Sequence, residues 1–170
     1  NERKKVNRSF FLEFTKGEIN GYIVRAKKLT EPIEEIYDWR TDILSELFDK
    51  TYVKKLIRDE GEKPIDDILM NQNIFSGVGN KIRNEALYRA GIHPLSLANK
   101  IPAAVLTKLV NEVVKYAKIF YKNLSTDGTN KDFDVYKKEF APDGSEVTMM
   151  VLKKTKPKIY FSEHRQKLYN

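Results

Sequence analysis

The fold is decided by residues 70–94, which read MNQNIFSGVGNKIRNEALYRAGIHP. This stretch predicts the end of one short helix, a tight turn, and a second helix that starts at about Gly79 or Asn80. Gly77 and Gly79 flank the turn, where a backbone without side chains reaches positive φ or approaches a partner closely. Gly91, followed closely by a proline, ends the second helix, because a left-handed residue closes it and proline cannot continue it.

The predicted start of the second helix suits an anion. Free N–H groups at a helix N-terminus and the helix dipole together favour a phosphate. Asn80 adds a side-chain amide there, and Lys81 and Arg83 add positive charge. The sequence therefore predicts that residues 77–80, which we call the glycine turn, face a phosphate.

The composition favours a polyanionic partner. The 170 residues carry a formal net charge of +7 and are 41% hydrophobic, which is enough apolar material for a core in about one domain or one and a half. A basic surface suits nucleic acid or an anionic membrane, although a solvated lysine-rich surface is the alternative. No apolar run approaches the about 20 residues of a membrane span. The chain has no Cys, which excludes disulfides and cysteine zinc sites and fits an intracellular protein.

Short β-elements flank a helical centre in the predicted architecture. Residues 9–14 and 19–27 predict a hairpin, which we interpret as the last part of a larger β-structure. Helices are predicted over 42–48, over 52–58 after a Thr51 cap, after Pro64, and over 101–124. Residues 133–136 are strand-like, and 147–152 is expected to pair with 159–161. The predicted fold class is mainly α with small β parts.

No self-contained active site is evident from the residues. His93 lies just past a helix end, where capping is its expected role, and His164 lies in a basic tail. Asp66 and Asp67 are adjacent, so we interpret them as charged surface and not as a carboxylate pair. The sequence contains no phosphate-binding loop, nucleophile elbow or zinc-protease motif. We therefore assign no catalytic residue in this chain and expect neither a metal nor a cofactor.

The C-terminal hairpin is a second candidate for phosphate contact. Lys153, Lys154, Lys156 and Lys158 surround its predicted turn, next to the aromatic residues of 159–161. A basic hairpin tip can enter a groove or grip phosphates, and a solvated lysine-rich turn is the alternative.

Residues 71–80 and 84–94 together resemble the helix–two-turn–helix signature of the formamidopyrimidine-DNA glycosylase and endonuclease VIII family. The resemblance continues over 38–49, 133–136 and 160–166. It implies a helix–two-turn–helix DNA-binding domain over 37–130. A remnant N-terminal β-hairpin over 1–36, the end of a β-sandwich domain, would precede that domain. A finger-like β-hairpin over 131–170 would follow it.

The resemblance also implies a function. Members are base-excision-repair DNA glycosylases with AP lyase activity, which flip a damaged nucleotide out of the duplex before an amine attacks its sugar. The expected partner is double-stranded, damaged DNA, bound by a monomer without membrane contact. The expected location is intracellular: the cytoplasm or nucleoid if the source is bacterial, and the nucleus if it is eukaryotic. The lesions that are removed do not follow from these residues.

The resemblance assigns roles to particular residues. Gly77, Gly79, Asn80 and Lys81 are expected to grip phosphates beside the lesion. Two further residues, Gln72 and Glu85, are expected to order the turn.

The finger departs from the family pattern. The family's finger uses four cysteines, whereas Ala141, Ser162 and Arg165 occupy three of the matching positions here, which implies a zincless finger. The family's finger arginine falls on Pro157, so Lys156 or Lys158 is expected to replace it, without a bidentate guanidinium.

Whether this chain is itself an enzyme stays open on these grounds. The family's nucleophile is an N-terminal proline amine followed by a glutamate, whereas this chain starts at Asn1 and its first proline is Pro32. The chain is therefore expected to be the DNA-binding portion of a larger glycosylase. The first alternative is a catalytically inactive module that binds damaged DNA. The second is an RNA-binding ribosomal-type helix–two-turn–helix protein, against which Gln72 and the Gly91–Pro94 ending argue.

Overall fold

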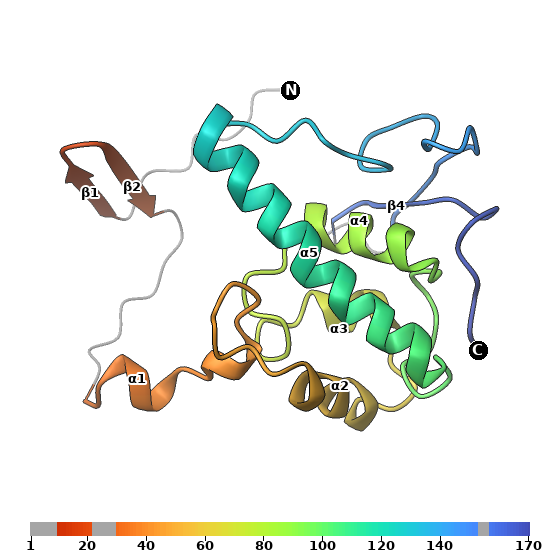
Figure 1. Cartoon of the computed structure of the whole chain (residues 1–170), viewed down its shortest axis with the longest axis horizontal. Coiled ribbons are helices and arrows are strands. Elements are labelled where there is room, and N and C mark those ends of the chain that lie inside the picture. The colour runs from red at the N-terminus through yellow and green to blue at the C-terminus, as the bar shows by residue number, and fades with distance from the viewer. Residues whose placement is uncertain (1–9, 22–29, 153–156) are drawn as a thin grey trace. The chain divides into compact units, whose positions relative to one another are not determined.

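The computed structural model describes residues 10–21, 30–152 and 157–170. The chain divides after Tyr37 into two compact units, 1–37 and 38–170. Helices dominate, and the strands form two separate antiparallel pairs, which confirms the predicted fold class (Figure 1).

The first unit contains a hairpin and a short helix. Strand β1 (Phe10–Phe14) pairs with β2 (Gly17–Gly21), in a register that sets Leu12 opposite Ile19. The predicted hairpin is thus confirmed, while the end of its predicted second strand, up to Lys27, lies outside the described residues. Helix α1 (Ile33–Ile36) follows.

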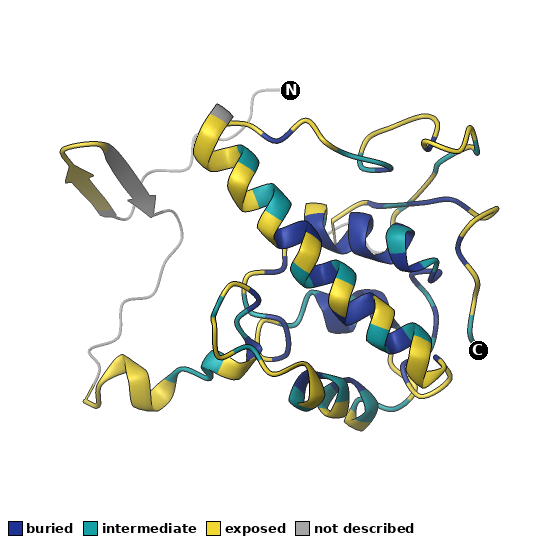
Figure 2. Cartoon of the chain, in the orientation of Figure 1, coloured by how far each residue is buried: buried dark blue, intermediate teal, exposed yellow. Residues whose placement is uncertain are grey.

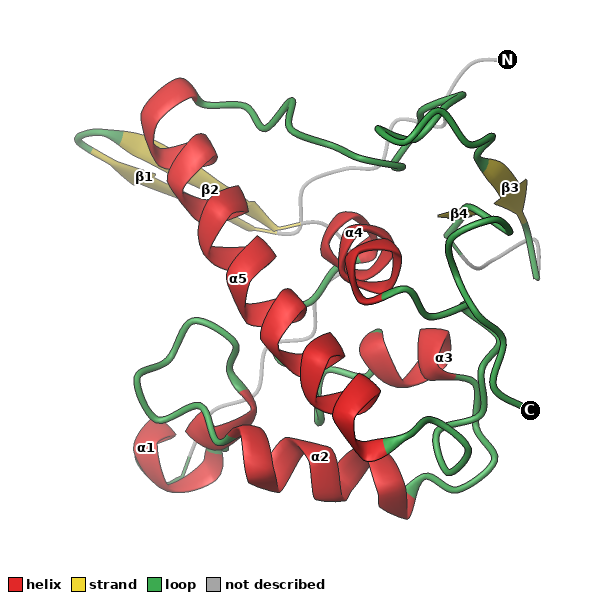
Figure 3. Ribbon diagram, turned by 45° about the vertical axis from the view of Figure 1, so that its right-hand side comes forward, coloured by secondary structure: helices red, strands yellow, loops and turns green. Residues whose placement is uncertain are grey.

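The second unit is built around one long helix. Its helical elements in chain order are the 3₁₀ helix η1 (Trp39–Thr41), α2 (Lys50–Asp59), α3 (Ile65–Leu69), α4 (Asn80–Ala90) and α5 (Ala103–Asp127). Helix α5 crosses α4, and α2 runs beside its first half (Figures 1 and 3). Two bonds fix α2 antiparallel to α5: Lys54 Nζ donates to Thr107 Oγ1 at 3.3 Å, and Lys50 Nζ donates to Asn111 Oδ1 at 2.9 Å.

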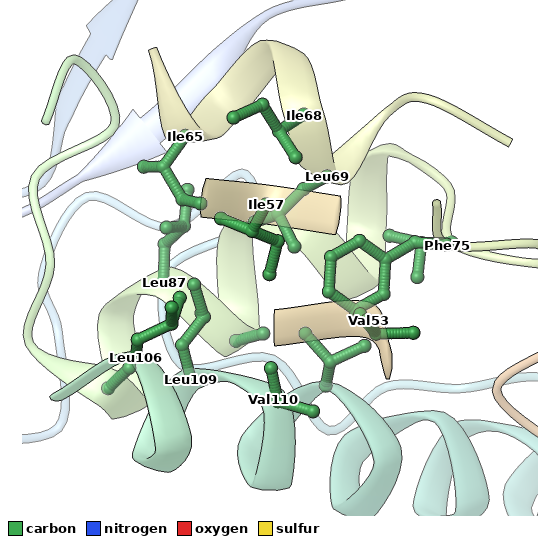
Figure 4. Packing of buried hydrophobic residues seen from close by; sticks show 14 of the residues in the cluster. Val53, Ile57, Ile65, Ile68, Leu69, Phe75, Leu87, Leu106, Leu109 and Val110 are labelled. Carbon is green, nitrogen blue, oxygen red and sulfur yellow. The ribbon is translucent and has the colours of Figure 1, made fainter. Parts of the chain in front are cut away.

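The core forms where these helices meet. The apolar face of α5, from Leu106 to Ala117, is buried, and it packs with α2, α3 and the segment that precedes α4 (Figure 4). Helix α4 is buried on almost every side (Figure 2), and eight of its eleven residues are buried. Its polar residues Arg83, Asn84 and Glu85 are among them. Buried polar groups destabilise a fold unless they are paired. Each of these side chains therefore requires a hydrogen-bond or ionic partner inside the protein.

The helix predicted over 42–48 is wrong, because this segment forms a series of turns. The side chains of Asp42 and Ser45 each accept a hydrogen bond at 3.0 Å from the backbone N–H two residues ahead. Such local bonds compete with helical hydrogen bonding. The N–H of Ile43 donates to Ser76 O at 3.2 Å, which ties the segment to the start of the glycine turn.

The following helix is also capped differently from the prediction. Asp49, and not Thr51, caps α2, through bonds from the N–H groups of Thr51 and Tyr52 to its carboxylate.

The C-terminal strands form the predicted hairpin. Strand β3 (Thr148–Met150) pairs antiparallel with β4 (Ile159–Phe161), with Met149 opposite Tyr160. Three of the four lysines predicted at its tip, Lys153, Lys154 and Lys156, lie outside the described residues. Among the helices that the structure describes, none is long and apolar enough to cross a membrane.

Candidate nucleic-acid interface

The two glycines of the glycine turn have different roles: one adopts a positive φ, and the other has open space where a side chain would be. Gly77 has φ +90°, and a Cβ there would lie 3.4 Å from Ile43 Cγ1. Gly79 is extended, and a Cβ added to it would meet nothing within 4 Å. Gly77 therefore sets the shape of the turn, whereas Gly79 leaves the approach to α4 unobstructed.

Gln72 holds the turn in this shape. Its Oε1 accepts a hydrogen bond from Gly77 N at 3.1 Å, and its Nε2 donates to Val78 O at 2.9 Å. One side chain thus engages both sides of the Gly77–Val78 segment. The turn is consequently formed before any partner arrives.

Asn80 is oriented by the helix that it begins. Its Oδ1 accepts hydrogen bonds from Arg83 Nη2 and from Asn84 Nδ2, the latter at 3.2 Å. The amide oxygen is thereby engaged on the protein side, and among the described residues the Asn80 Nδ2 donor has no hydrogen-bond partner. No side chain caps α4, so the backbone N–H groups ahead of Arg83 keep no acceptor within the helix.

Arg83 is not the surface cation that the sequence suggested. It is 2% exposed and lies against Asp66, which is 1% exposed, with 3.1 Å between Arg83 Nε and Asp66 Oδ1. Burial lowers the pKa of Arg83 from its usual value, and the charge of Asp66 opposes that shift. Asp66 is therefore a buried partner and not charged surface. Arg83 Nη2 also donates to Lys158 O at 2.9 Å, which joins α4 to the start of β4.

Glu85 supports a different segment from the one expected. Its carboxylate does not reach the glycine turn but accepts the backbone N–H groups of Asp134, Val135 and Tyr136 at 2.7, 3.1 and 2.8 Å. The segment predicted as strand-like is therefore a loop held on a buried carboxylate. Burial raises the pKa of Glu85, and these three bonds oppose the shift.

The four residues assigned to the turn lie around one hollow. Gly77, Gly79, Asn80 and Lys81 line it together with Ile82, Phe120 and Tyr136. Lys81 Nζ lies 5.5 Å from the ring centroid of Phe120 and 5.8 Å from that of Phe133, within the range of cation–π attraction. The hollow thus combines backbone N–H donors, the Asn80 side-chain amide and the Lys81 ammonium, which lies beside aromatic rings. These groups together can bind an anion.

Residues 40–133 match the family described as "Formamidopyrimidine-DNA glycosylase H2TH domain", and this range is more than half of the chain. The chain belongs to this family. The matched residues include the glycine turn, α4 and α5, which supply the lining of the hollow apart from Tyr136. The family is not the ribosomal-type alternative considered above.

Curated relatives show the same similarity over this region. The chain is similar to Endonuclease 8-like 2 of Homo sapiens, at 40% identity over 106 residues that cover 62% of this chain and 31% of the relative. It is also similar to formamidopyrimidine-DNA glycosylase of Prochlorococcus marinus, at 38% over 85 residues, covering 50% of this chain and 28% of that one. The chain therefore spans about a third of the length of these relatives.

Solved structures share the fold. A viral DNA glycosylase superposes with a TM-score of 0.69 at 22% identity, covering 79% of this chain and 52% of that one. Lactococcus lactis formamidopyrimidine-DNA glycosylase, non-covalently bound to abasic-site DNA, gives a TM-score of 0.67 at 22% identity and covers 75% of this chain and 49% of that one.

The C-terminal hairpin, which the resemblance predicted to be a zincless finger, is held by hydrogen bonds in its described residues. Ser162 is fully buried, and its Oγ lies 2.7 Å from Ser145 Oγ, which donates to Asp143 Oδ1 at 2.6 Å. Arg165 stacks its guanidinium 4.8 Å from the ring centroid of Tyr88 on α4. In the described part of the chain, no three His, Cys, Asp or Glu residues lie together as a metal site would require.

Two side chains join the C-terminal hairpin to the residues that follow α4. Gln166 accepts from Ser162 N at 2.9 Å and donates to Ile92 O at 2.8 Å. His93 packs edge-on against Phe161 with 4.6 Å between ring centroids, and its Nδ1 accepts from Leu95 N at 3.2 Å. Burial lowers the pKa of His93. The sequence did not reveal the bond from Gln166 to Ile92, because these residues lie 74 positions apart and only the fold brings them together.

Proposed function

We propose that this chain is the DNA-binding portion of a base-excision-repair DNA glycosylase with AP lyase activity that acts on oxidised or otherwise damaged bases. The observation that carries the proposal is the setting of Asn80, which lines an open hollow beside Lys81 at an uncapped helix N-terminus and whose Oδ1 is engaged by Arg83 and Asn84. The relatives named endonuclease 8-like and formamidopyrimidine-DNA glycosylase support the same class of substrate.

The proposed ligand of the hollow is a backbone phosphate of duplex DNA. The first amides of α4, Asn80 Nδ2 and Lys81 Nζ supply donors of three kinds around one anion, and the helix dipole adds to them. Contacts of this type position the protein on the duplex without reading sequence. They also make affinity fall steeply with salt, because each neutralised phosphate releases counterions.

The C-terminal hairpin is proposed to hold the backbone at a second place. Lys158 is exposed at the start of β4, and its backbone carbonyl is fixed by Arg83. Lys156, its alternative, lies outside the described residues. The chemical step is proposed to depend on an amine that residues outside this chain supply. This chain is proposed to bind the DNA and to position it. It would act as a monomer where DNA is kept, in the nucleoid or the nucleus.

Replacing Asn80 tests this function directly. We expect Asn80→Ala to weaken binding to a duplex with an abasic-site analogue by about 10- to 150-fold, because one hydrogen bond to a charged group contributes about 1.5–3 kcal/mol. Asn80→Asp should weaken it further, because it keeps the acceptor for Arg83 but places a negative charge toward the phosphate. Fluorescence anisotropy of labelled duplex measures both affinities.

Asn99→Ala, at an exposed asparagine outside the turn, is the matched control and should bind like the unmodified chain. If Asn80→Asp bound the duplex as tightly as that control, the assigned role of the turn would be wrong.

A further inference from the structure

A second hollow continues from the glycine turn. It is lined by Lys81, Asn130, Lys131, Phe133, Tyr136, Lys137 and Lys138. Lys81 and Tyr136 also line the hollow at the turn, so the two are neighbours along one surface. We call the second one the lysine groove.

The charge of the lysine groove has one sign. Four of its lining residues are lysines, and Lys131, Lys137 and Lys138 are exposed, while no acidic residue of the described chain lines it. The buried Asn130 is engaged with its neighbours: its Oδ1 accepts from Asn123 Nδ2 at 2.7 Å, and its Nδ2 donates to Tyr116 Oη at 3.1 Å. The groove therefore offers exposed ammonium groups beside aromatic rings, and no carboxylate among its described lining residues neutralises them.

Lys137 holds an unfavourable backbone conformation in this groove. Its φ is +58°, the only positive value at a non-glycine residue among those described. Lys138 N donates to Val135 O at 3.1 Å, so Lys137 is the third residue of a β-turn, a place that glycine or asparagine fills with less strain. Glu85 fixes that turn by accepting from Val135 and Tyr136 N. Strained backbone of this kind is concentrated at functional sites, which makes the Lys137 ammonium a candidate for ligand contact.

Lys137 is also held beside an aromatic surface. Its Nζ lies 5.7 Å from the ring centroid of Tyr136, the residue that lines both hollows. Lys81 Nζ likewise lies 5.8 Å from the ring centroid of Phe133. Ammonium groups interleaved with aromatic rings suit a nucleic-acid strand, which presents phosphates and flat bases together.

We propose that the lysine groove is a second phosphodiester site that receives the same DNA strand beyond the phosphate held at the glycine turn. Lys131, Lys137 and Lys138 are its ligands, and Lys81 lies between the two sites. The inference rests on the proposed function but assigns residues outside the H2TH turn. It makes Glu85 the residue that shapes this site, since its carboxylate holds the turn that carries Lys137.

The test uses a substitution whose effects on stability and on binding have opposite signs. Lys137→Gly relieves the left-handed strain and removes one charge. We expect a higher melting temperature and weaker binding to a duplex with an abasic-site analogue. The slope of log K against log[salt] should decrease in magnitude by about the value of one phosphate contact. Lys137→Arg should keep the salt dependence. Lys138→Ala serves as the second variant and should also weaken binding.

Lys108→Ala is the control, because it removes an exposed lysine on α5 and changes the net charge equally. If Lys137→Gly and Lys138→Ala matched this control in affinity and salt dependence while Asn80→Ala lost affinity, the groove would be excluded and the proposed function would stand. Absence of duplex binding by the unmodified chain would instead overturn both.

Discussion

Asp66→Ala is expected to lower the free energy of unfolding by about 3–5 kcal/mol, because it leaves the Arg83 charge buried without its partner. Both side chains are at most 2% exposed, so water cannot take the place of the carboxylate without opening the core. The substitution should also weaken DNA binding. Arg83 is the residue that donates to Asn80 Oδ1 and to Lys158 O, and a displaced guanidinium releases both.

Urea unfolding measures the stability effect. Asp59→Ala removes the same charge from an exposed position on α2 and should change the stability by no more than about 0.5 kcal/mol. Asp66→Leu combined with Arg83→Met should recover part of the loss, because an apolar pair leaves no buried charge behind. A loss for Asp66→Ala as small as that for Asp59→Ala would show that the pair is not a buried support of the fold.

Glu85→Ala is expected to lower the free energy of unfolding by about 3–5 kcal/mol, because three backbone N–H groups lose their acceptor at once. Each buried unpaired donor costs about 1–3 kcal/mol. The carboxylate is fully buried, and Val135 beside it has no exposed surface. The loop 133–136 should therefore detach from α4, and the lysine groove should lose its shape with it.

Glu85→Gln separates the hydrogen bonds from simple packing. Glutamine keeps one acceptor oxygen, while its amide nitrogen faces a backbone donor, so we expect an intermediate cost of about 1–3 kcal/mol. Amide hydrogen exchange should show faster exchange at residues 134–136 in Glu85→Ala than in Glu85→Gln. If Glu85→Gln were as stable as the unmodified chain while Glu85→Ala lost stability, Glu85 would contribute volume and not hydrogen bonds.

The glycine turn could be predicted because its signals are local. Two glycines at a spacing of two, a following helix and the Gly91 ending can be read along the chain, and the structure has α4 starting at Asn80 as expected. The fold class followed in the same way from short strand patterns around apolar helical stripes.

Gln72 was expected to order the turn and does bond to it, whereas the buried charged partners around α4 were missed because they are long-range. Arg83 and Asp66 lie 17 positions apart, on two helices whose relative placement the sequence does not show, so both were interpreted as surface charges. Glu85 reaches a loop about fifty positions further on. The error at 42–48 has the opposite origin: local bonds from Asp42 and Ser45 overrode a helical apolar pattern.

The central claim is that the glycine turn receives a DNA phosphate, and the most direct measurement is an NMR titration of the ¹⁵N-labelled chain with a duplex carrying an abasic-site analogue. We predict that the largest shifts fall on the backbone amides of Gly79, Asn80 and Lys81 and on the side-chain amide of Asn80, and that added salt reverses them. If the duplex bound and shifted other resonances while these amide resonances stayed unchanged, the account would be contradicted.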